Sequence, residues 1–282
     1  MSRSLRHQRT LAAPVSLEGV GYWSDADVTL VFQPAEPNTG FVFVREDLPG
    51  KPRIPVCCEN QVEMPLRTCL RTDSAQVEMT EHVLSALAGM WVDNCEIHTT
   101  AAEMPGLDGS ALPIVNALES VGYEEQEPLV SLRTVSECLR ESKSPECWVE
   151  MAPATAEVLT LGFELCYTNE PGIGRQSASF PITPEVYQRE IAPARTFTTL
   201  AEAQQILAMG LAKRATFQDL LVFDERGPIE NVLRFPDECV RHKILDLLGD
   251  LTLGGAFLAD VRGHRSGHAL NVRLVRKLRE NH

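Results

Sequence analysis

Two segments of this 282-residue chain repeat one order of elements, and this internal repeat restricts the available folds more than any other feature. In each segment a predicted helix with an early histidine, His82 or His242, is followed by a predicted strand and then by a glycine turn that opens another helix. The turns match in part, Gly109-Ser110-Ala111-Leu112 against Gly267-His268-Ala269-Leu270, at similar distances from their histidines (82 to 110 and 242 to 268). The repeat predicts a duplicated unit with helices packed on one face of a sheet. Because the match is short, duplication is a hypothesis at this point.

The pattern of the whole chain predicts an α+β protein with two similar halves. Residues 28–34 and 40–47 are rich in β-branched and aromatic residues around the turn sequence AEPNTG, which predicts that these two strands pair with each other. Helices are predicted from Thr80, where Thr80 is a candidate N-cap, and over residues 110–121, 200–209, 239–251 and from residue 266 onward. The charged, proline-containing stretch 124–132 predicts a boundary between an N-terminal half, residues 1–126, and a C-terminal half, residues 127–282.

Composition excludes some functions. The net charge of −13 is spread over the chain, and an acidic surface repels a phosphate backbone, so no nucleic-acid partner is expected. An anionic substrate would have to be bound by a few basic side chains gathered at its site. The eight cysteines are scattered without a C-x-x-C pair, which predicts reduced thiols and a cytoplasmic location. The opening MSRSLRHQRT has no apolar segment after it, and no run of 18 apolar residues follows, so neither a signal peptide nor a membrane span is expected.

The segment CVRHKILDLLGDL, residues 239–251, places polar side chains in a stripe. On a helix that turns about 100° per residue, His242, Asp246 and Asp250 lie near 0°, 40° and 80°, with Lys243 near 100°. The apolar side chains at roughly 140–240° are Ile244, Leu247, Leu248 and Leu251. One interpretation is a solvated face, on which a His–Asp pair four residues apart contributes a few tenths of a kcal/mol. The other is a metal site, since histidine and aspartate at this spacing can bind one ion from one face.

A hydrolytic metal site needs a third protein ligand, an open position for water, and a base within reach of that water. The sequence TEH supplies candidates for both roles, with His82 as the ligand and Glu81 as the base. In the first turn of a helix the dipole favours an ionised glutamate and a neutral histidine. An acidic residue is also common at helix starts without any catalytic role, and this alternative stays open for Glu81.

His268 follows Ser266 near the start of the last predicted helix. The pKa of a histidine is lowered at a helix N-terminus, so His268 would need a carboxylate partner to act as an imidazolium acid. Asp250, one turn beyond Asp246, is the candidate partner. A surface or capping histidine is the alternative.

Several ordered segments make nearly the whole chain similar to a known family. They are QRTLAAPVSLEGVG, TEHVLSALAG, MPGLDGSALP, GRQ, ARTF, FPDECVRHKILDLLGDL and RSGHALNVRLV. Together they resemble UDP-3-O-acyl-N-acetylglucosamine deacetylase, the zinc amidase of lipid A synthesis. The resemblance implies two similar α+β halves, each a sheet with helices on one face, whose helical layers pack together with the active site between them. It also favours the metal interpretation of residues 239–251 over the solvated face.

The resemblance implies a role in hydrolysis for five residues. One Zn²⁺ per chain, with Fe²⁺ as the alternative, would be bound by His82, His242 and Asp246. Glu81 would act as the base for the water that attacks the acetamide carbonyl, and the Thr196 hydroxyl in ARTF would help to stabilise the oxyanion. The products would be acetate and the free amine.

Five residues would serve the leaving group and the substrate. His268, oriented by Asp250, would protonate the leaving amine or stabilise the charged intermediate; whether Glu81 alone moves both protons is left open. Lys243 would add positive charge near the intermediate or the diphosphate, Phe197 would pack on the sugar, and Arg265 would lie near the phosphates. The implied partner is a lipid-tailed UDP-sugar, whose acyl chain needs an apolar passage.

Association with other molecules is less constrained. The resemblance implies a monomer. The last predicted helix carries four basic residues, which either lie on a plain solvated face or make a peripheral contact with an anionic membrane. They are Arg273, Arg276, Lys277 and Arg279.

The chain departs from the family pattern at three places. It reads GVGYWSD over residues 19–25, where the family typically has GVGIHTG or GVGLHTG, and KRATF over residues 213–217, where the family has a glycine-rich GGS. Cys147 precedes Trp148, where a lysine often stands. Arg214 would either clash with the usual glucosamine position or contact a phosphate. These departures leave the zinc chemistry untouched but keep a zinc deacetylase of another N-acetylated sugar open as an alternative. A non-catalytic metal-binding homologue is a separate alternative.

Overall fold

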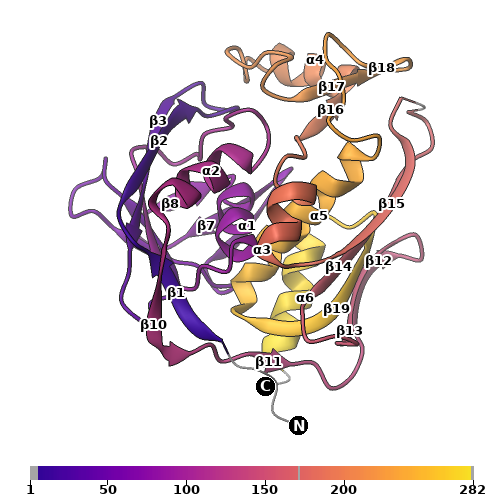
Figure 1. Ribbon diagram of the computed structural model, residues 1–282. Helices are drawn as coiled ribbons and strands as arrows, with labels where there is room; N and C mark the ends of the chain where they lie inside the picture. The colour runs from indigo at the N-terminus through magenta and orange to yellow at the C-terminus, as the bar shows by residue number, and fades with distance from the viewer. Residues whose placement is uncertain (1–5, 171, 281–282) are drawn as a thin grey trace.

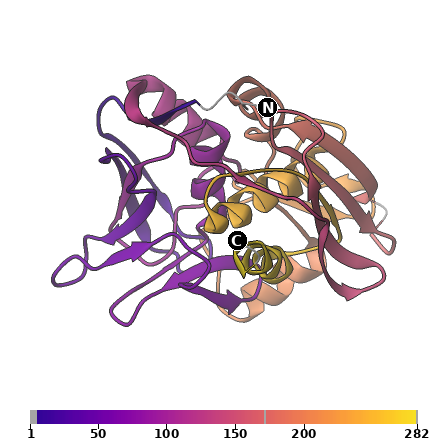
Figure 2. The ribbon, with the colours of Figure 1, turned by 90° about the horizontal axis from the view of Figure 1, so that it is seen from below.

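Two β-sheets of the same topology form the outer layers of the protein, and helices fill the space between them (Figures 1 and 2). The structure is a computed structural model that describes residues 6–170 and 172–280. The first five residues, on which part of the signal-peptide expectation rests, lie outside this range. The predicted α+β class with two similar halves is confirmed.

The first sheet has the strand order β2-β3-β9-β4-β5, formed by Val15–Val20, Asp27–Pro34, Cys95–Thr99, Phe41–Arg45 and Arg53–Pro55. The prediction that residues 28–34 and 40–47 pair with each other is wrong, because β9 lies between β3 and β4. Every second side chain of β9 is buried, as suits a central strand. The six-residue linker AEPNTG is longer than a tight hairpin turn, so it can cross two inter-strand spacings.

The second sheet has the order β12-β13-β19-β14-β15, formed by Leu139–Ser144, Cys147–Pro153, Phe257–His264, Thr160–Tyr167 and Gly174–Pro181. Its central strand β19 is antiparallel to β13 and parallel to β14, as β9 is to β3 and β4 in the first sheet. A short strand β11 (Arg133–Thr134) also pairs with β19. In each half, one helix precedes the central strand and another follows it. The matching topology supports the duplication hypothesis.

Each half carries an insertion at the same point, between its edge strand (β5 or β15) and the helix that precedes its central strand. In the first half it is a three-stranded sheet of β6 (Gln61–Met64), β7 (Arg67–Arg71) and β8 (Gln76–Glu78). In the second half it comprises α3 (Pro184–Val186), a π-helical turn (Tyr187–Ile191), β16 (Phe197–Thr199), α4 (Leu200–Ala208), β17 (Leu221–Asp224) and β18 (Gly227–Pro228). These insertions contribute much of the cavity described below.

The link between the halves is itself a strand. β10 (Tyr123–Leu129) pairs antiparallel with β1 (His7–Leu11), so the predicted boundary at residue 126 falls inside a paired strand. The division into residues 1–126 and 127–282 stays a prediction.

Four helices make the inner layers: α1 (Glu81–Gly89), α2 (Leu112–Val121), α5 (Glu238–Leu251) and α6 (His268–Glu280). Thr80 precedes α1 as predicted, but its hydroxyl makes no cap; it donates to the Thr68 carbonyl at 3.4 Å instead. The helices α1 and α5 lie against each other across the middle of the molecule (Figure 1). A Cβ atom on Gly249 of α5 would lie 2.2 Å from the Glu81 carbonyl oxygen, so glycine is required for this close approach.

We expect Gly249→Ala to lower the free energy of unfolding by roughly 1–3 kcal/mol, because the added methyl meets the backbone of α1. In an exposed helix the same change would raise helix stability by about 1 kcal/mol. A decrease in the free energy of unfolding would therefore be evidence for the contact with α1. Urea unfolding of the two proteins measures the difference. Gly267→Ala is the control, since a Cβ at Gly267 meets nothing within 4 Å. An alanine at 249 that left stability unchanged would contradict the close approach.

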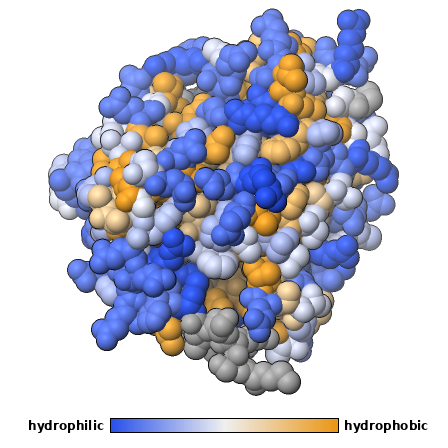
Figure 3. All heavy atoms as spheres, viewed as in Figure 1, coloured by the Kyte–Doolittle hydropathy of each residue, from blue (hydrophilic) through white to orange (hydrophobic). Residues whose placement is uncertain are grey.

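Hydrophilic residues cover most of the face in Figure 3, with hydrophobic residues in small groups between them. Among residues 6–170 and 172–280, no helix has both the length and the apolar character needed to cross a membrane. All eight cysteines are free.

Candidate active site

The polar stripe of α5 is buried. His242, Asp246 and Asp250 are 2%, 5% and 0% exposed, and the leucine side of the helix is buried as well. The solvated-face interpretation is therefore wrong. A single amphipathic helix does not reveal that a second helix covers its polar side, which here is α1.

His82, His242 and Asp246 form a group that could hold one metal ion. The Oδ1 atom of Asp246 lies 3.6 Å from Nε2 of His82 and 3.3 Å from Nε2 of His242. Ligand bonds of about 2.0–2.2 Å in tetrahedral geometry separate neighbouring donor atoms by about 3.3 Å, so the spacing fits a single ion. The two imidazole rings meet edge to face, with centroids 5.0 Å apart.

Neighbouring groups favour the protonation states in which two of these residues, His242 and Asp246, can bind a metal ion. Nδ1 of His242 donates to the carbonyl of Ala194 at 3.1 Å, which leaves Nε2 free to bind a cation. Burial lowers the pKa of His242 to about 3, so the ring is neutral at pH 7. Burial opposes ionisation of Asp246, but the Lys243 ammonium, 2.6 Å from Oδ2, and His242 hold the pKa of Asp246 well below its usual range. Oδ2 thus faces Lys243 while Oδ1 faces the histidines.

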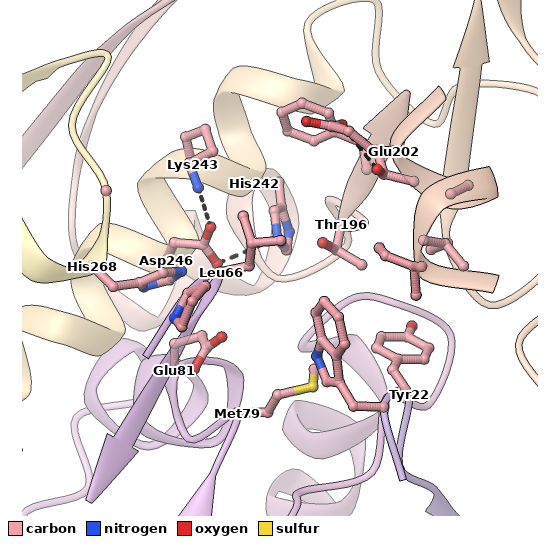
Figure 4. A pocket seen from close by; sticks show the side chains of 18 of the residues that line it. Tyr22, Leu66, Met79, Glu81, Thr196, Glu202, His242, Lys243, Asp246 and His268 are labelled. Atoms are coloured by element: carbon pink, nitrogen blue, oxygen red, sulfur yellow. Dashed lines mark hydrogen bonds and ion pairs between the residues drawn. The ribbon is translucent and has the colours of Figure 1, made fainter. Parts of the chain in front are cut away.

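Glu81 lies beside the metal group at the start of α1, and its side chain points toward the same space as that of His268 (Figure 4). It is 3% exposed, and burial raises its pKa. Oε2 accepts a hydrogen bond from the backbone N–H of Thr68 at 3.0 Å. A buried carboxyl with a raised pKa is suited to accept a proton from water near neutral pH.

His268 and Asp250 form the predicted pair. Nδ1 of His268 lies 3.0 Å from each carboxylate oxygen of Asp250. The helix N-terminus was expected to lower the pKa of His268. Burial does act to lower it, but the Asp250 carboxylate outweighs burial and raises the pKa to about 9. His268 is therefore an imidazolium at neutral pH.

The metal group opens into a cavity of about 880 Å³. The remaining predicted residues all line it: Thr196, Phe197, Lys243 and Arg265. The ring of Phe197 stands edge to face with His242, with centroids 6.3 Å apart. Thr196 lies across the cavity from Glu81 (Figure 4). The structure thus brings every predicted site residue to one place, while their roles remain predictions.

The departing segments 19–25 and 213–217 lie at the cavity and bind each other. The carboxylate of Asp25 accepts from the backbone N–H groups of Lys213 and Arg214, at 3.2 and 2.8 Å. The Arg214 guanidinium pairs with Asp27 at 2.8 Å and donates to the Asp25 carbonyl at 2.9 Å. Arg214 is thus held by acidic partners of the protein itself. Tyr22 and Trp23 line the cavity wall beside this contact.

Two residues near the functional groups were not predicted from the sequence. Asn271 donates from Nδ2 to Oδ2 of Asp250 at 2.8 Å, and the Thr68 hydroxyl donates to Oδ1 at 2.5 Å. Asn271 stands one turn after His268 on α6, so helical spacing could have indicated it. Thr68 lies in a short strand of the first insertion, and no periodicity connects it to the site.

Fold and site together define a class: a two-halved α+β protein with a buried group of side chains that could hold one metal ion, and with a carboxyl and an imidazolium beside it. This set of groups is typical of hydrolases that activate water. The family model described as LpxC, UDP-3-O-acyl N-acetylglycosamine deacetylase, matches residues 8–280. The chain belongs to this family.

Individual relatives agree over almost the full length. A UDP-3-O-acyl-N-acetylglucosamine deacetylase of Myxococcus xanthus is 38% identical over 99% of this chain and 88% of its own length. The protein of the same name from Syntrophus aciditrophicus is 37% identical over 97% of this chain and 86% of its own length. A bifunctional LpxC/FabZ enzyme of Chlorobaculum tepidum is 34% identical over 98% of this chain, which spans 65% of that longer protein.

Proposed function

We propose that this protein is a zinc-dependent deacetylase that hydrolyses the N-acetyl group of UDP-3-O-(3-hydroxyacyl)-N-acetylglucosamine in lipid A biosynthesis. The observation that carries the proposal is the convergence of His82, His242 and Asp246 at one cavity, with Glu81 beside them. The names of the relatives supply the substrate class. Among residues 6–170 and 172–280, the group contains two imidazoles and one carboxylate and no fourth protein ligand. Such a set suits a catalytic Zn²⁺ site, and Fe²⁺ is the alternative ion.

When bound, the metal would polarise the amide carbonyl and make a neighbouring water more acidic. Glu81 takes the proton from the attacking water, with Oε2 held by Thr68. The Thr196 hydroxyl donates to the carbonyl oxygen as negative charge develops on it. The imidazolium of His268 donates its Nε2 proton to the amine nitrogen as the C–N bond breaks, and acetate and the free amine leave.

The rest of the cavity suits a lipid-tailed anion. Lys243 and Arg265 supply cations to a protein whose net charge is −13, and Phe197 offers a flat apolar surface for the sugar. The residues Ile206 and Leu207 of α4 line the same cavity and would contact the acyl chain. The cations would thus bind the diphosphate, Phe197 the sugar, and the α4 residues the acyl chain of the substrate.

The test is metal analysis together with acetate release from the UDP-linked substrate. Purified protein should contain about one zinc ion per chain and release acetate. A zinc-loaded protein that released none from any acetylated sugar would support the non-catalytic metal-binding alternative and end the proposal.

A second candidate is a deacetylase of another N-acetylated sugar. It is favoured by the contact between segments 19–25 and 213–217, since both depart from the family pattern and both border the cavity. A panel of acetylated substrates separates the two. Preference for the UDP-linked acylated glucosamine supports the first, and preference for a sugar without UDP supports the second.

The rate should depend on pH as a bell-shaped curve. The pKa of Glu81 is raised and its base form is needed, so activity rises with pH through that value. The pKa of His268 is raised to about 9 and its acid form is needed, so activity falls as pH passes about 9. We expect His268→Gln to lower kcat and to remove the basic limb of the kcat profile. A basic limb that persists unchanged in this variant would assign the acid role to another group.

A further inference from the structure

Thr68 lies between Glu81 of α1 and Asp250 of α5, although it belongs to neither helix. It stands on β7, in the insertion of the first half, and is fully buried. Its carbonyl accepts from the backbone N–H of Thr80 at 3.3 Å, which ties β7 to the residue before α1. One small residue therefore contacts functional groups from both halves of the molecule.

The backbone of Thr68 orients Glu81. Its N–H donates to Oε2 of Glu81 at 3.0 Å, and a hydrogen bond to an ionised acceptor is stronger than one between neutral groups. This bond occupies one carboxylate oxygen and leaves the other for the cavity. Because the donor is a backbone group, every side chain at position 68 except proline preserves it.

The hydroxyl of Thr68 orients the Asp250–His268 pair. A carboxylate only accepts, so the single hydroxyl proton goes to Oδ1 of Asp250, at 2.5 Å. The oxygen then has lone pairs free, and Nδ1 of His268 lies 3.2 Å away. Nδ1–H can therefore donate to Thr68 and Asp250 together, which directs Nε2 away from Asp250 and fixes the plane of the ring.

The carboxylate of Asp250 has no exposed surface and relies on three side-chain donors, the Thr68 hydroxyl, Nδ1 of His268 and Nδ2 of Asn271. Asn271 and His268 both belong to α6, so they move together. Thr68 is the donor that comes from the other half. Removing it would leave one carboxylate oxygen held by His268 alone and would allow the ring to rotate.

We propose that Thr68 is a positioning residue, whose backbone N–H holds Glu81 and whose hydroxyl holds the Asp250–His268 pair, so that base and acid face the cavity in a fixed relation. The inference rests on the proposed function, because it assumes that Glu81 and His268 act on one substrate. It assigns the insertion of the first half a part in the reaction itself.

The test compares Thr68→Val, which keeps the shape and the backbone N–H but removes the hydroxyl, with Thr68→Ser, which keeps both polar groups. We expect Thr68→Val to lower kcat about 10- to 100-fold, with KM changed less than about twofold and metal content unchanged; partners that orient functional groups typically contribute this much. Thr68→Ser should recover kcat to within about threefold of the unaltered protein. The nitrogen chemical shifts of the His268 ring, recorded at one pH on metal-free protein, should change in Thr68→Val and not in Thr68→Ser.

Thr10→Val controls for the loss of a buried hydroxyl in general. Thr10 is buried, donates to the Asn94 carbonyl at 2.8 Å and accepts from the Ala35 N–H at 2.9 Å, on a strand that does not line the cavity. It should lower the unfolding midpoint without changing kcat. Equal kcat in Thr68→Val and the unaltered protein, or equal losses in Thr68→Val and Thr68→Ser, would overturn the inference. An unaltered protein that releases no acetate would instead overturn the proposed function, and the ring shifts would still test the contact.

Discussion

Glu81→Gln will lower kcat by 10²- to 10⁴-fold while the protein keeps its metal ion, because the glutamine side chain cannot take a proton from water. The amide oxygen can still accept from the Thr68 N–H, so the fold and the orientation of the side chain are preserved. Glu81 is not one of the three residues in the metal group, which separates its loss from loss of metal.

The measurement is kcat for acetate release beside zinc content from the same preparation. Glu81→Ala provides a second variant, in which the hydrogen bond to Thr68 is also lost. Turnover that survives within about tenfold in both variants would show that another group accepts the proton. That result would support the alternative in which Glu81 is an acidic residue at a helix start without a catalytic role.

Asp246→Ala will remove both metal binding and activity. Oδ1 of Asp246 is the atom that both metal-facing histidines approach, and Oδ2 neutralises the Lys243 ammonium. Breaking a buried ion pair by removing one partner costs about 3–5 kcal/mol, so the variant will also be less stable. We expect well under one zinc per chain and no detectable acetate release.

Asp250→Ala is the matched comparison, one turn along the same helix. Asp250 is buried like Asp246 but lies outside the metal group, so this variant should keep about one zinc per chain while its kcat falls. The double variant Asp246→Ala with Lys243→Met removes the unpaired ammonium and separates loss of metal from loss of stability. Stoichiometric zinc in the folded double variant would show that Asp246 is not a ligand.

Local sequence predicted the elements of the site well. Helical spacing places His242, Asp246 and Asp250 on one side of α5, and the structure keeps them there. The predicted helices begin within two residues of the observed starts of α1, α2, α4, α5 and α6. Hydrogen bonds along a helix join residues four apart, so its periodicity is recorded in a short stretch of sequence.

Strand pairing was predicted less well. The pattern of residues 28–47 indicates two strands but not the insertion of β9 between them, since the partner of a strand can lie anywhere in the chain. The same limit applies to Arg214, whose acidic partners Asp25 and Asp27 lie almost 190 residues earlier. The identity of a residue does not indicate which distant residues it contacts in the folded protein.

The sequence alone determined which residues could do chemistry here, because the stripe on α5 and the Glu81-His82 pair depend on neighbours a few residues apart. Only the tertiary structure decided that these groups meet. The burial of the stripe requires α1 to approach α5 at Gly249, and the contact of Thr68 with Asp250 and His268 joins residues about 180 and 200 positions apart. Such contacts depend on how sheets and helices pack, and packing depends on the shape of the whole molecule rather than on any one segment.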